Sequence, residues 1–506
     1  MIGDTGSVIR VNSIGTHTLL KGPIMPIWTV HGDGKNIEPG QVVAPMERLS
    51  WGRTIGLGGQ HVVSMFGATF VFPIIMGLNP QLAVMLSGFC TLFFLAVVKG
   101  RIPSYLGTSA AFVGGIAAIY AQGGSPAEVT GAIMVSGLVL AAIGVVIHFL
   151  GGSLVFKILP PVVTGAVVML IGFNLAPVVA GTYWPQDQWV ALTVMIALIV
   201  ASVVLRGFLG RVAIFLALLF GYALSWILDR ISGPITSYDP GAEAVTEHFR
   251  VNWEGVTSAP WFGLPPFSDE ATGVVGIHAP SFSLTFIVLV LPGVIALIAE
   301  NAGHVKAVAE ITKTDLDPMM GRALAGDGLA TALATSVGGS PTTTYAENIG
   351  VMAATRVYST AAYAAAGVIA MLLGFSPKFG AIISATPGGV LGGITVVLYG
   401  IIGLLGAKIW KENGVDFGDP RNLMPVAAGL IIAIGDTSLQ FTDTFSLSGI
   451  ALGTIVVIGL YHLCRVIAPK DIAPEDPDTP FEQGEPGRTE PDPDGESGAG
   501  RVKEFA

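Results

Sequence analysis

The sequence predicts an all-α membrane protein with fourteen transmembrane spans, arranged as two inverted repeats of seven spans each. Three observations lead to this fold class. The 506 residues are 52% hydrophobic and only 12% charged, whereas an ordinary soluble domain has about 25% charged residues. Apolar segments near the ~20 residues that a bilayer requires recur along most of the chain. Basic residues recur in every second loop and therefore gather on one side of these segments.

The composition also limits the kind of protein. The net charge is −10 at pH 7, but much of it lies in the tail after Lys470, so it indicates no nucleic-acid partner. Only Cys90 and Cys464 are present, far apart and in apolar surroundings, which argues against a disulfide framework or a zinc site. The first fifty residues are polar and lack an early apolar segment. We therefore expect no cleavable signal peptide, and the first span must direct insertion.

Five regions follow in order along the chain. We expect 1–50 to form a cytoplasmic N-terminal extension, 51–229 the first seven-span repeat, and 230–282 an extracytoplasmic loop. The second repeat covers 283–468, and 469–506 is an acidic, Pro-rich and Gly-rich tail that we expect to be disordered. The predicted spans are 54–76, 81–99, 104–121, 127–150, 156–180, 188–206, 210–229, 283–304, 322–338, 341–356, 359–374, 383–406, 422–436 and 446–466.

The basic residues give an independent check on these spans. With the spans placed as above, only Arg230, Arg250 and Lys378 fall on one side. The other side is therefore cytoplasmic, with both termini on it, and the protein is expected in the cell (cytoplasmic) membrane. The residues on that side are Arg48, Arg53, Lys99, Arg101, Lys157, Arg206, Arg211, Lys306, Lys313, Arg322, Arg356, Lys408, Lys411, Arg421, Arg465 and Lys470.

The third and tenth spans have a similar and unusual beginning. The third starts Ile102-Pro103-Ser104-Tyr105-Leu106-Gly107-Thr108-Ser109, and the tenth starts Ser340-Pro341-Thr342-Thr343-Thr344-Tyr345-Ala346. An odd number of spans in each half gives the two halves opposite orientations, so these segments occupy matching positions. Interrupted segments at matching positions are typical of a transporter binding site. The alternative is two Pro-initiated helices near the membrane surface.

Ionisable residues occur in the most apolar part of the chain. Glu300 and His304 are four residues apart and share one helix face. Glu347 follows a proline and three threonines, a run that favours extended backbone. Because a charge near the middle of a bilayer costs roughly 2.5–3.5 kcal/mol on insertion scales, such residues usually face a pathway or a partner. We predict a membrane transporter whose substrate lies between the two carboxylates. The alternatives are a structural Glu300–His304 pair and a helix N-terminal role for Glu347.

The segment 341–359 resembles the signature of the nucleobase–ascorbate transporter family, nearest to its uracil-permease branch. The matching core is Thr342-Thr343-Thr344-Tyr345-Ala346-Glu347-Asn348-Ile349-Gly350, and xanthine and urate carriers tend to have Gln in place of Glu347. The segments Glu300-Asn301-Ala302-Gly303-His304, Gln60-His61 and 102–109 are also similar to family motifs. The likeness extends over about 51–468.

The resemblance implies a fold and a set of functional residues. Spans 1–4 and 8–11 would form a substrate-carrying core domain and the other spans a gate domain, with short strands in spans 3 and 10 meeting at the membrane midplane. Glu300 and Glu347 would hydrogen-bond a uracil ring, His304 would take part in proton coupling, and backbone amides near Ala110 and Ala346 would meet the carbonyls. Ala346 stands where the family usually has Gly, and Ala110 where the bacterial uracil carrier has Phe, so the nucleobase preference stays open.

Further residues complete the predicted site. Ser109 and Tyr345 are expected among the substrate-binding residues, with His61, Thr108 and Asn348 in supporting positions. His61 is expected to act mainly as an interhelical hydrogen-bonding group. Asp327, between two glycines and near Arg322, is expected to have a structural role.

These residue types suit a small, neutral, planar ring with N–H donors and carbonyl acceptors. Carboxylates accept from the N–H groups, and amides at the start of a helix donate to the carbonyl oxygens. Burial and mutual repulsion of Glu300 and Glu347 favour a proton on at least one of them near neutral pH. We therefore expect a proton to enter with the substrate and to leave on the cytoplasmic side.

Other functions stay open at this point. They are a carrier of xanthine, urate or another oxidised purine, a passive channel, and an intramembrane metalloenzyme with Glu300, His304 and Glu347 as zinc or iron ligands. No HExxH motif supports the enzyme. We expect no enzymatic activity, no resident metal and no cofactor apart from the coupled proton. The expected partners are the nucleobase, the bilayer and, from the resemblance, a second copy of the chain in a homodimer formed by the gate domain.

Overall fold

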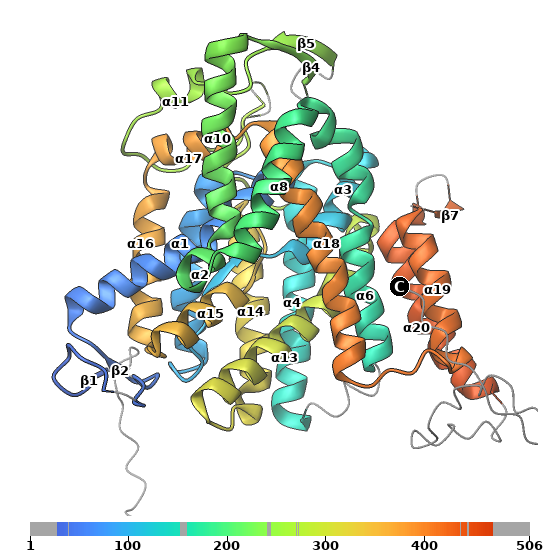
Figure 1. Cartoon of the computed structure of the whole chain (residues 1–506). Helices are drawn as coiled ribbons and strands as arrows, with labels where there is room; N and C mark the ends of the chain where they lie inside the picture. Colours follow the sequence, from blue (N-terminus) through green and yellow to red (C-terminus); the bar gives the residue numbers. More distant parts are fainter. Residues whose placement is uncertain are drawn as a thin grey trace, which may run out of the picture.

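The computed structural model describes residues 28–38, 40–151, 159–239, 244–269, 271, 273–435, 437–442 and 445–468. The described chain is mainly helical (Figure 1). The tail 469–506, which we expected to be disordered, and 1–27 of the predicted N-terminal extension lie outside these residues.

The first half of the chain folds as the predicted spans indicate, with one extended interruption. The helices begin close to the predicted positions, several of them at a proline, which suits the first turn because its missing N–H has no helical partner there. The elements are α1 (Trp51–Ile75), α2 (Pro80–Val97), β3 (Leu106–Thr108), the 3-10 turn η1 (Ala110–Phe112), α3 (Val113–Ala121), α4 (Pro126–Leu150), α6 (Pro161–Phe173), α7 (Ala176–Val178), the π-turn η2 (Val179–Tyr183), the 3-10 turn η3 (Trp184–Gln186), α8 (Gln188–Val204), α9 (Gly207–Arg211) and α10 (Ala213–Ser232).

The second half repeats this pattern of a strand between helices. Its elements are α12 (Leu284–Val290), α13 (Pro292–Thr312), the 3-10 turn η4 (Asp317–Met319), α14 (Met320–Thr335), β6 (Thr342–Thr344), α15 (Ala346–Thr355), α16 (Thr360–Gly374), α17 (Pro377–Ser384), α18 (Gly388–Glu412), α19 (Pro420–Ile434) and α20 (Gly449–Ile467).

The helices define a polytopic membrane protein. Among the described residues, eight helices are long and apolar enough to cross a membrane, and α16 with α17, bent by 86°, could form a ninth. Shorter apolar helices cover Ala110–Ala121, Gln188–Val204 and Pro420–Ile434. Each of the fourteen predicted segments contains a described helix, but the number that cross the bilayer stays a prediction.

Two short strands interrupt the helical bundle. β3 and β6 pair in antiparallel orientation, with Gly107 opposite Thr343 at the centre of the register. The β-branched threonines of β6 favour extended backbone, and both strands are buried. The expectation of extended segments in the third and tenth predicted spans is therefore confirmed. The alternative of two Pro-initiated helices near the surface is wrong.

The helices pack as two groups around these strands. In one group α4 packs along α14, and α16 packs along α2 and α1; in the other, α18 packs along α6 and α8, and α19 along α20. Figure 1 shows α1, α2, α15 and α16 on one side and α6, α18, α19 and α20 on the other. Close approach of α2 and α16 depends on Gly88, because a Cβ there would overlap the carbonyl oxygen of Gly367.

The segments outside the helices gather at two ends of the molecule. β1 (Thr29–Val30) pairs in parallel with β2 (Glu47–Arg48), and Val43 packs with Leu49 and Val357 beneath α15 and α16. The antiparallel hairpin β4 (Ile235–Asp239) and β5 (Ala244–His248), with α11 (Glu254–Ser258), lies at the opposite end (Figure 1). A second antiparallel hairpin, β7 (Ser438–Thr442) and β8 (Phe445–Ser448), connects α19 to α20. The predicted loop 230–282 and the N-terminal segment are thus on opposite ends of the helical bundle.

Candidate functional site

The candidate site is built around the β3–β6 pair and the two helices that follow it. Backbone hydrogen bonds extend the pair at both ends: Ser109 N–H donates to the Pro341 carbonyl (2.9 Å), and Tyr345 N–H donates to the Tyr105 carbonyl (3.0 Å). Each strand then leads directly into the first turn of a helix, η1–α3 after β3 and α15 after β6. Two helix N-termini therefore begin inside the protein.

The first turns of these helices differ in how they are capped. The Ser109 hydroxyl accepts from the Ala111 N–H (3.2 Å) at the start of η1. At the start of α15, Tyr345 provides no side-chain cap, and the next residue, Ala346, is exposed although its strand neighbours are buried. The first N–H groups of a helix have no partner within the helix and carry its positive dipole end. The start of α15 can therefore donate hydrogen bonds to a ligand.

Three carboxylates lie near this helix start. Glu347 is in the first turn of α15, and Glu300 is on α13, which packs against both β6 and α15. Glu300 is close enough to Glu347 and to Asp327 on α14 for the three charges to interact. The predicted juxtaposition of Glu300 and Glu347 is thus present in the structure. Asp327, to which we had given only a structural role, joins them.

A chain of hydrogen bonds connects α13, β6 and α14. His304 Nδ1 lies 2.7 Å from the Thr344 hydroxyl, which donates to the Asn301 side-chain oxygen (3.3 Å). The Asn301 amide in turn donates to Asp327 Oδ2 (2.5 Å), and Asp327 Oδ1 is buried without a hydrogen-bond partner among the described residues. Neither Asn301 nor Thr344 was among the predicted site residues. The signal that could have found this network is an acidic residue in the middle of an apolar helix.

The structure does not support a structural pair between Glu300 and His304. Among the described residues the two side chains form no hydrogen bond or ion pair, and His304 contacts Thr344 instead. Its imidazole is therefore held against the strand that leads to Glu347.

Tyr345, predicted to bind substrate, holds the strand pair together. Its buried hydroxyl donates to the Thr108 carbonyl (2.8 Å) and lies 3.1 Å from the Thr69 hydroxyl on α1. Its ring covers Gly107, where a Cβ would lie 2.5 Å from it. The hydroxyl of Thr108 lies 2.9 Å from that of Ser340. Tyr345, Thr108 and Ser109 thus all make contacts that fix the two strands.

His61 and Asn348 form a buried contact between α1 and α15. The Asn348 amide donates to the His61 carbonyl (2.9 Å) and lies 3.2 Å from His61 Nδ1. Tyr363 on α16 donates to the Asn348 carbonyl (3.0 Å), and its ring centroid lies 4.2 Å from that of His61. His61 is an interhelical hydrogen-bonding residue, as predicted. Asn348 orients the helix that carries Glu347.

The described residues contain no group of three or more His, Cys, Asp or Glu side chains that could hold a metal ion. Glu300, His304 and Glu347 therefore do not form the ligand set that the metalloenzyme alternative needs.

A strand-broken pair of helices with internal carboxylates, in a polytopic membrane protein, defines a transporter. Comparison with known proteins identifies the family: a family profile described as "Permease family" matches residues 52–441. The chain belongs to this family, the nucleobase–ascorbate transporters, whose members are permeases and not enzymes.

Three curated relatives illustrate the similarity. A candidate pyrimidine permease, RutG of Escherichia coli (strain K12), is 44% identical over 429 residues, which cover 83% of this chain and 92% of the relative. The uracil permease of Bacillus caldolyticus is 35% identical over 424 residues (81% and 91%). The uracil permease of Escherichia coli (strain K12) is 32% identical over 447 residues (85% and 96%).

Solved structures show a shared fold at low sequence identity. The inward-facing structure of the murine Slc26a9 anion transporter matches with a TM-score of 0.54 at 11% identity, covering 82% of this chain and 68% of that one. A structure of SLC26A9 matches with a TM-score of 0.52 at 11% identity, covering 82% and 65%.

Proposed function

We propose that this chain is a nucleobase permease that imports uracil together with a proton. The relatives named uracil permease, at 32–35% identity over most of the chain, support the substrate class. The observation that carries the proposal is the uncapped start of α15, where the exposed Ala346 precedes Glu347 and lies on the helix that packs against the one carrying Glu300.

The groups at this position complement a uracil ring. The carboxylates of Glu300 and Glu347 would accept from the ring N–H groups, and the first N–H groups of α15 would donate to a ring carbonyl. The half-buried Ala110, at the start of the other helix, would place its backbone near a second carbonyl. A site whose buried groups need these partners discriminates strongly against analogues that lack them.

The same carboxylates would couple uptake to protons. Glu300 repels both Asp327 and Glu347 when the groups are ionised, and a proton on Glu300 removes that repulsion. A proton would enter with the substrate and leave on the cytoplasmic side. His304, held on Thr344, would keep the proton-accepting groups and the strand in a fixed relation.

Transport would occur by an elevator-like movement of one helix group against the other. In this proposal the core domain holds α1–α4 and α12–α16, the gate domain holds the remaining long helices, and fourteen spans form two inverted repeats. Both termini would be cytoplasmic, in the cell membrane, and two copies would associate through the gate domain. The alternative is a carrier of xanthine, urate or another oxidised purine, and Glu347, in place of the Gln that such carriers tend to have, speaks against it.

Uptake into proteoliposomes tests the proposal. We would measure accumulation of radiolabelled uracil under an imposed inward proton gradient for wild type, Glu300→Gln and Glu347→Gln. The control is Glu412→Gln, since this exposed residue pairs only with Lys408 at the end of α18. We expect gradient-dependent accumulation by wild type and the control and its loss in both site variants. Accumulation of xanthine but not of uracil would make xanthine the assigned substrate. Accumulation of neither base would reject the proposed function.

A further inference from the structure

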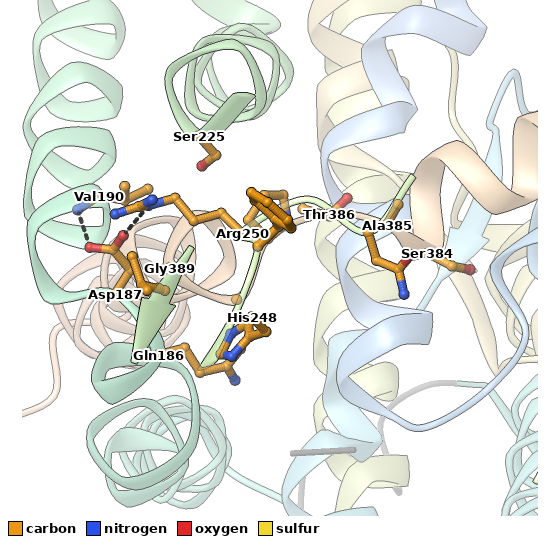
Figure 2. A pocket seen from close by; sticks show the side chains of 15 residues that line it. Gln186, Asp187, Val190, Ser225, His248, Arg250, Ser384, Ala385, Thr386 and Gly389 are labelled. Carbon is orange, nitrogen blue, oxygen red and sulfur yellow. Dashed lines mark hydrogen bonds and ion pairs between the residues drawn. The ribbon is translucent and has the colours of Figure 1, made fainter. Parts of the chain in front are cut away.

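A pocket of about 230 Å³, lined in part by residues of the β4–β5 hairpin, lies apart from the β3–β6 pair (Figure 2). Its walls come from η3, the starts of α8 and α18, the middle of α10, the end of β5 and the connection from α17 to α18. The polar side chains that line it include Gln186, Asp187, Ser225, His248, Arg250 and Thr386. None of them belongs to the site proposed above.

The one arginine of the pocket is already neutralised. Arg250 Nε donates to Asp187 Oδ2 (2.7 Å), and Nη1 donates to Asp229 Oδ1 (3.2 Å). Figure 2 shows the Arg250 side chain reaching across to Asp187, whose second oxygen caps α8 by accepting from Val190 N–H. Since two carboxylates offset one guanidinium, the pocket does not favour an anion.

The start of α18 supplies hydrogen-bond donors to the pocket. This 25-residue helix has Pro387 at its N-cap, which provides no side-chain cap, and its first two residues, Gly388 and Gly389, line the pocket. The Gln186 amide nitrogen donates to the Thr182 carbonyl (2.8 Å), and its oxygen lies so close to Gly388 that a Cβ there would overlap it. The backbone N–H donors at the start of α18 and the acceptor oxygen of Gln186 therefore lie side by side in the pocket.

A second, independent observation indicates a ligand. Ser225 on α10 is fully buried and lines the pocket, yet its hydroxyl has no hydrogen-bond partner among the described residues. In Figure 2 this hydroxyl points from α10 toward the part of the pocket that Arg250 crosses. A buried hydroxyl without a partner destabilises the folded state, so a bound molecule that pairs with it would remove this cost.

We propose that this pocket is an outer binding site for a neutral, planar molecule with carbonyl and N–H groups, which is the nucleobase itself if the proposed function holds. The free donors of α18 and Ser225 suit ring carbonyls, and the Gln186 oxygen suits a ring N–H. The volume is below the roughly 300–1,000 Å³ of sites for drug-sized ligands, and it suits a single ring. The occupant would contact 384–389, the connection between α17 and α18.

Protection of an introduced cysteine tests this site in the purified full-length chain. Ser384→Cys places a thiol on an exposed residue of the pocket, and Ser258→Cys places a control thiol on the exposed surface of α11. The background is Cys464→Ser, and Cys90 is buried and unreactive. For each cysteine variant we would measure the rate of maleimide modification with and without uracil. The same measurements would be repeated on proteins that also carry Glu347→Gln.

Uracil at ten times its Kd for the outer site should slow modification of Ser384→Cys about tenfold, because roughly nine-tenths of the outer sites are then occupied. The protection should persist with Glu347→Gln, should be lost with Ser225→Ala, and should not occur at Ser258→Cys. Ser225→Ala only removes an unpartnered hydroxyl and should fold. The matched control is Thr454→Val, which removes another buried unpartnered hydroxyl outside the pocket and should keep the protection.

The outcomes separate this site from the proposed function. Loss of protection with Glu347→Gln, retention with Ser225→Ala, or no protection in the wild-type background would each overturn the outer site. If proteoliposomes still accumulate uracil in that case, the proposed function stands without it. Protection without any uptake would keep the outer site and reject the proposed transport.

Discussion

His304 Nδ1 lies 2.7 Å from the hydroxyl oxygen of Thr344, on the strand that leads into the helix of Glu347. The contact continues through Asn301 to Asp327, so four polar side chains on α13, β6 and α14 form one network. Because hydrogen bonds in such networks depend on one another, a change at one end should alter the other. Asp327 and the strand that leads to Glu347 are thus coupled by direct contacts.

The hydroxyl of Thr344 should therefore contribute more to uracil uptake than its methyl group does. Thr344→Val keeps the shape and the strand preference but removes the contact with His304 and the hydrogen bond to Asn301. We expect uracil uptake to fall about threefold to tenfold, since a hydrogen bond contributes about 0.5–1.5 kcal/mol. Thr344→Ser should retain most of the uptake. Equal initial rates for Thr344→Val and wild type in proteoliposomes would show that the contact has no part in transport.

Gly107 should tolerate no side chain. A Cβ at this position would lie 2.5 Å from the Tyr345 ring and 2.6 Å from the Thr69 hydroxyl. Gly107→Ala should lower the free energy of unfolding by about 1–3 kcal/mol, because overpacking forces neighbouring groups apart. The control is Gly59→Ala on α1, where a Cβ meets no atom within 4 Å. Thermal unfolding in detergent would give the midpoint temperature of each variant, and equal midpoints for Gly107→Ala and Gly59→Ala would contradict the packing argument.

Asn348 should be required for the attachment of α15 to α1. Asn348→Ala removes the buried hydrogen bond to the His61 carbonyl, the contact with His61 Nδ1 and the side-chain volume between the two helices. The expected loss of stability is about 1–3 kcal/mol. Asn413→Ala, at an exposed residue that donates only to the Ile409 carbonyl, should have little effect. Chemical unfolding curves would compare the two variants, and similar small losses in both would reject a special role for Asn348.

Glu47 should make the N-terminal segment sensitive to acid. Burial acts to raise the pKa of Glu47, but hydrogen bonds from the Ala44 N–H and from His31 outweigh it and leave the pKa below its usual 4.5. A lowered folded-state pKa stabilises the fold above pH 4.5, and this contribution disappears as the pH falls through the lowered value.

The matched variant for this effect is Glu47→Gln. It should be less stable than wild type at neutral pH, and the difference should shrink below pH 4.5, where wild-type Glu47 takes up its proton. Thermal unfolding between neutral and acidic pH would show this convergence. A difference that stays constant across the range would mean that the Glu47 charge does not contribute.

Sequence patterns predicted the helices and the two extended segments because both follow from local chemistry, whereas the pairing of the two strands was implied only by the family resemblance. A window of apolar residues defines a span, and Pro341 followed by threonines defines an extended segment. The boundaries were less accurate where a helix continues beyond its apolar part. The eighth predicted span ended at 304, whereas α13 continues to Thr312, since backbone hydrogen bonds do not require apolar side chains.

The contacts within the site could not be predicted in the same way. Asn301 and Asp327 are 26 residues apart, and His304 and Thr344 are 40 apart, so no local period relates them. The outer pocket joins Arg250 to Asp187 over 63 residues and lies partly in an irregular loop. Which distant residues form these hydrogen bonds depends on how the helices pack, and this packing cannot be read from a single sequence.

The pairing of β3 with β6 also constrains how the protein is made. Thr108 and its contact Ser340 are 232 residues apart, so β3 must wait for its partner strand during synthesis. At about 5–20 residues per second this delay is roughly 10–50 s. Until then the first half offers this backbone the Thr91 hydroxyl, which accepts from the Leu106 N–H. The β3–β6 pair therefore forms late in biogenesis, after the second half of the nascent chain has supplied β6.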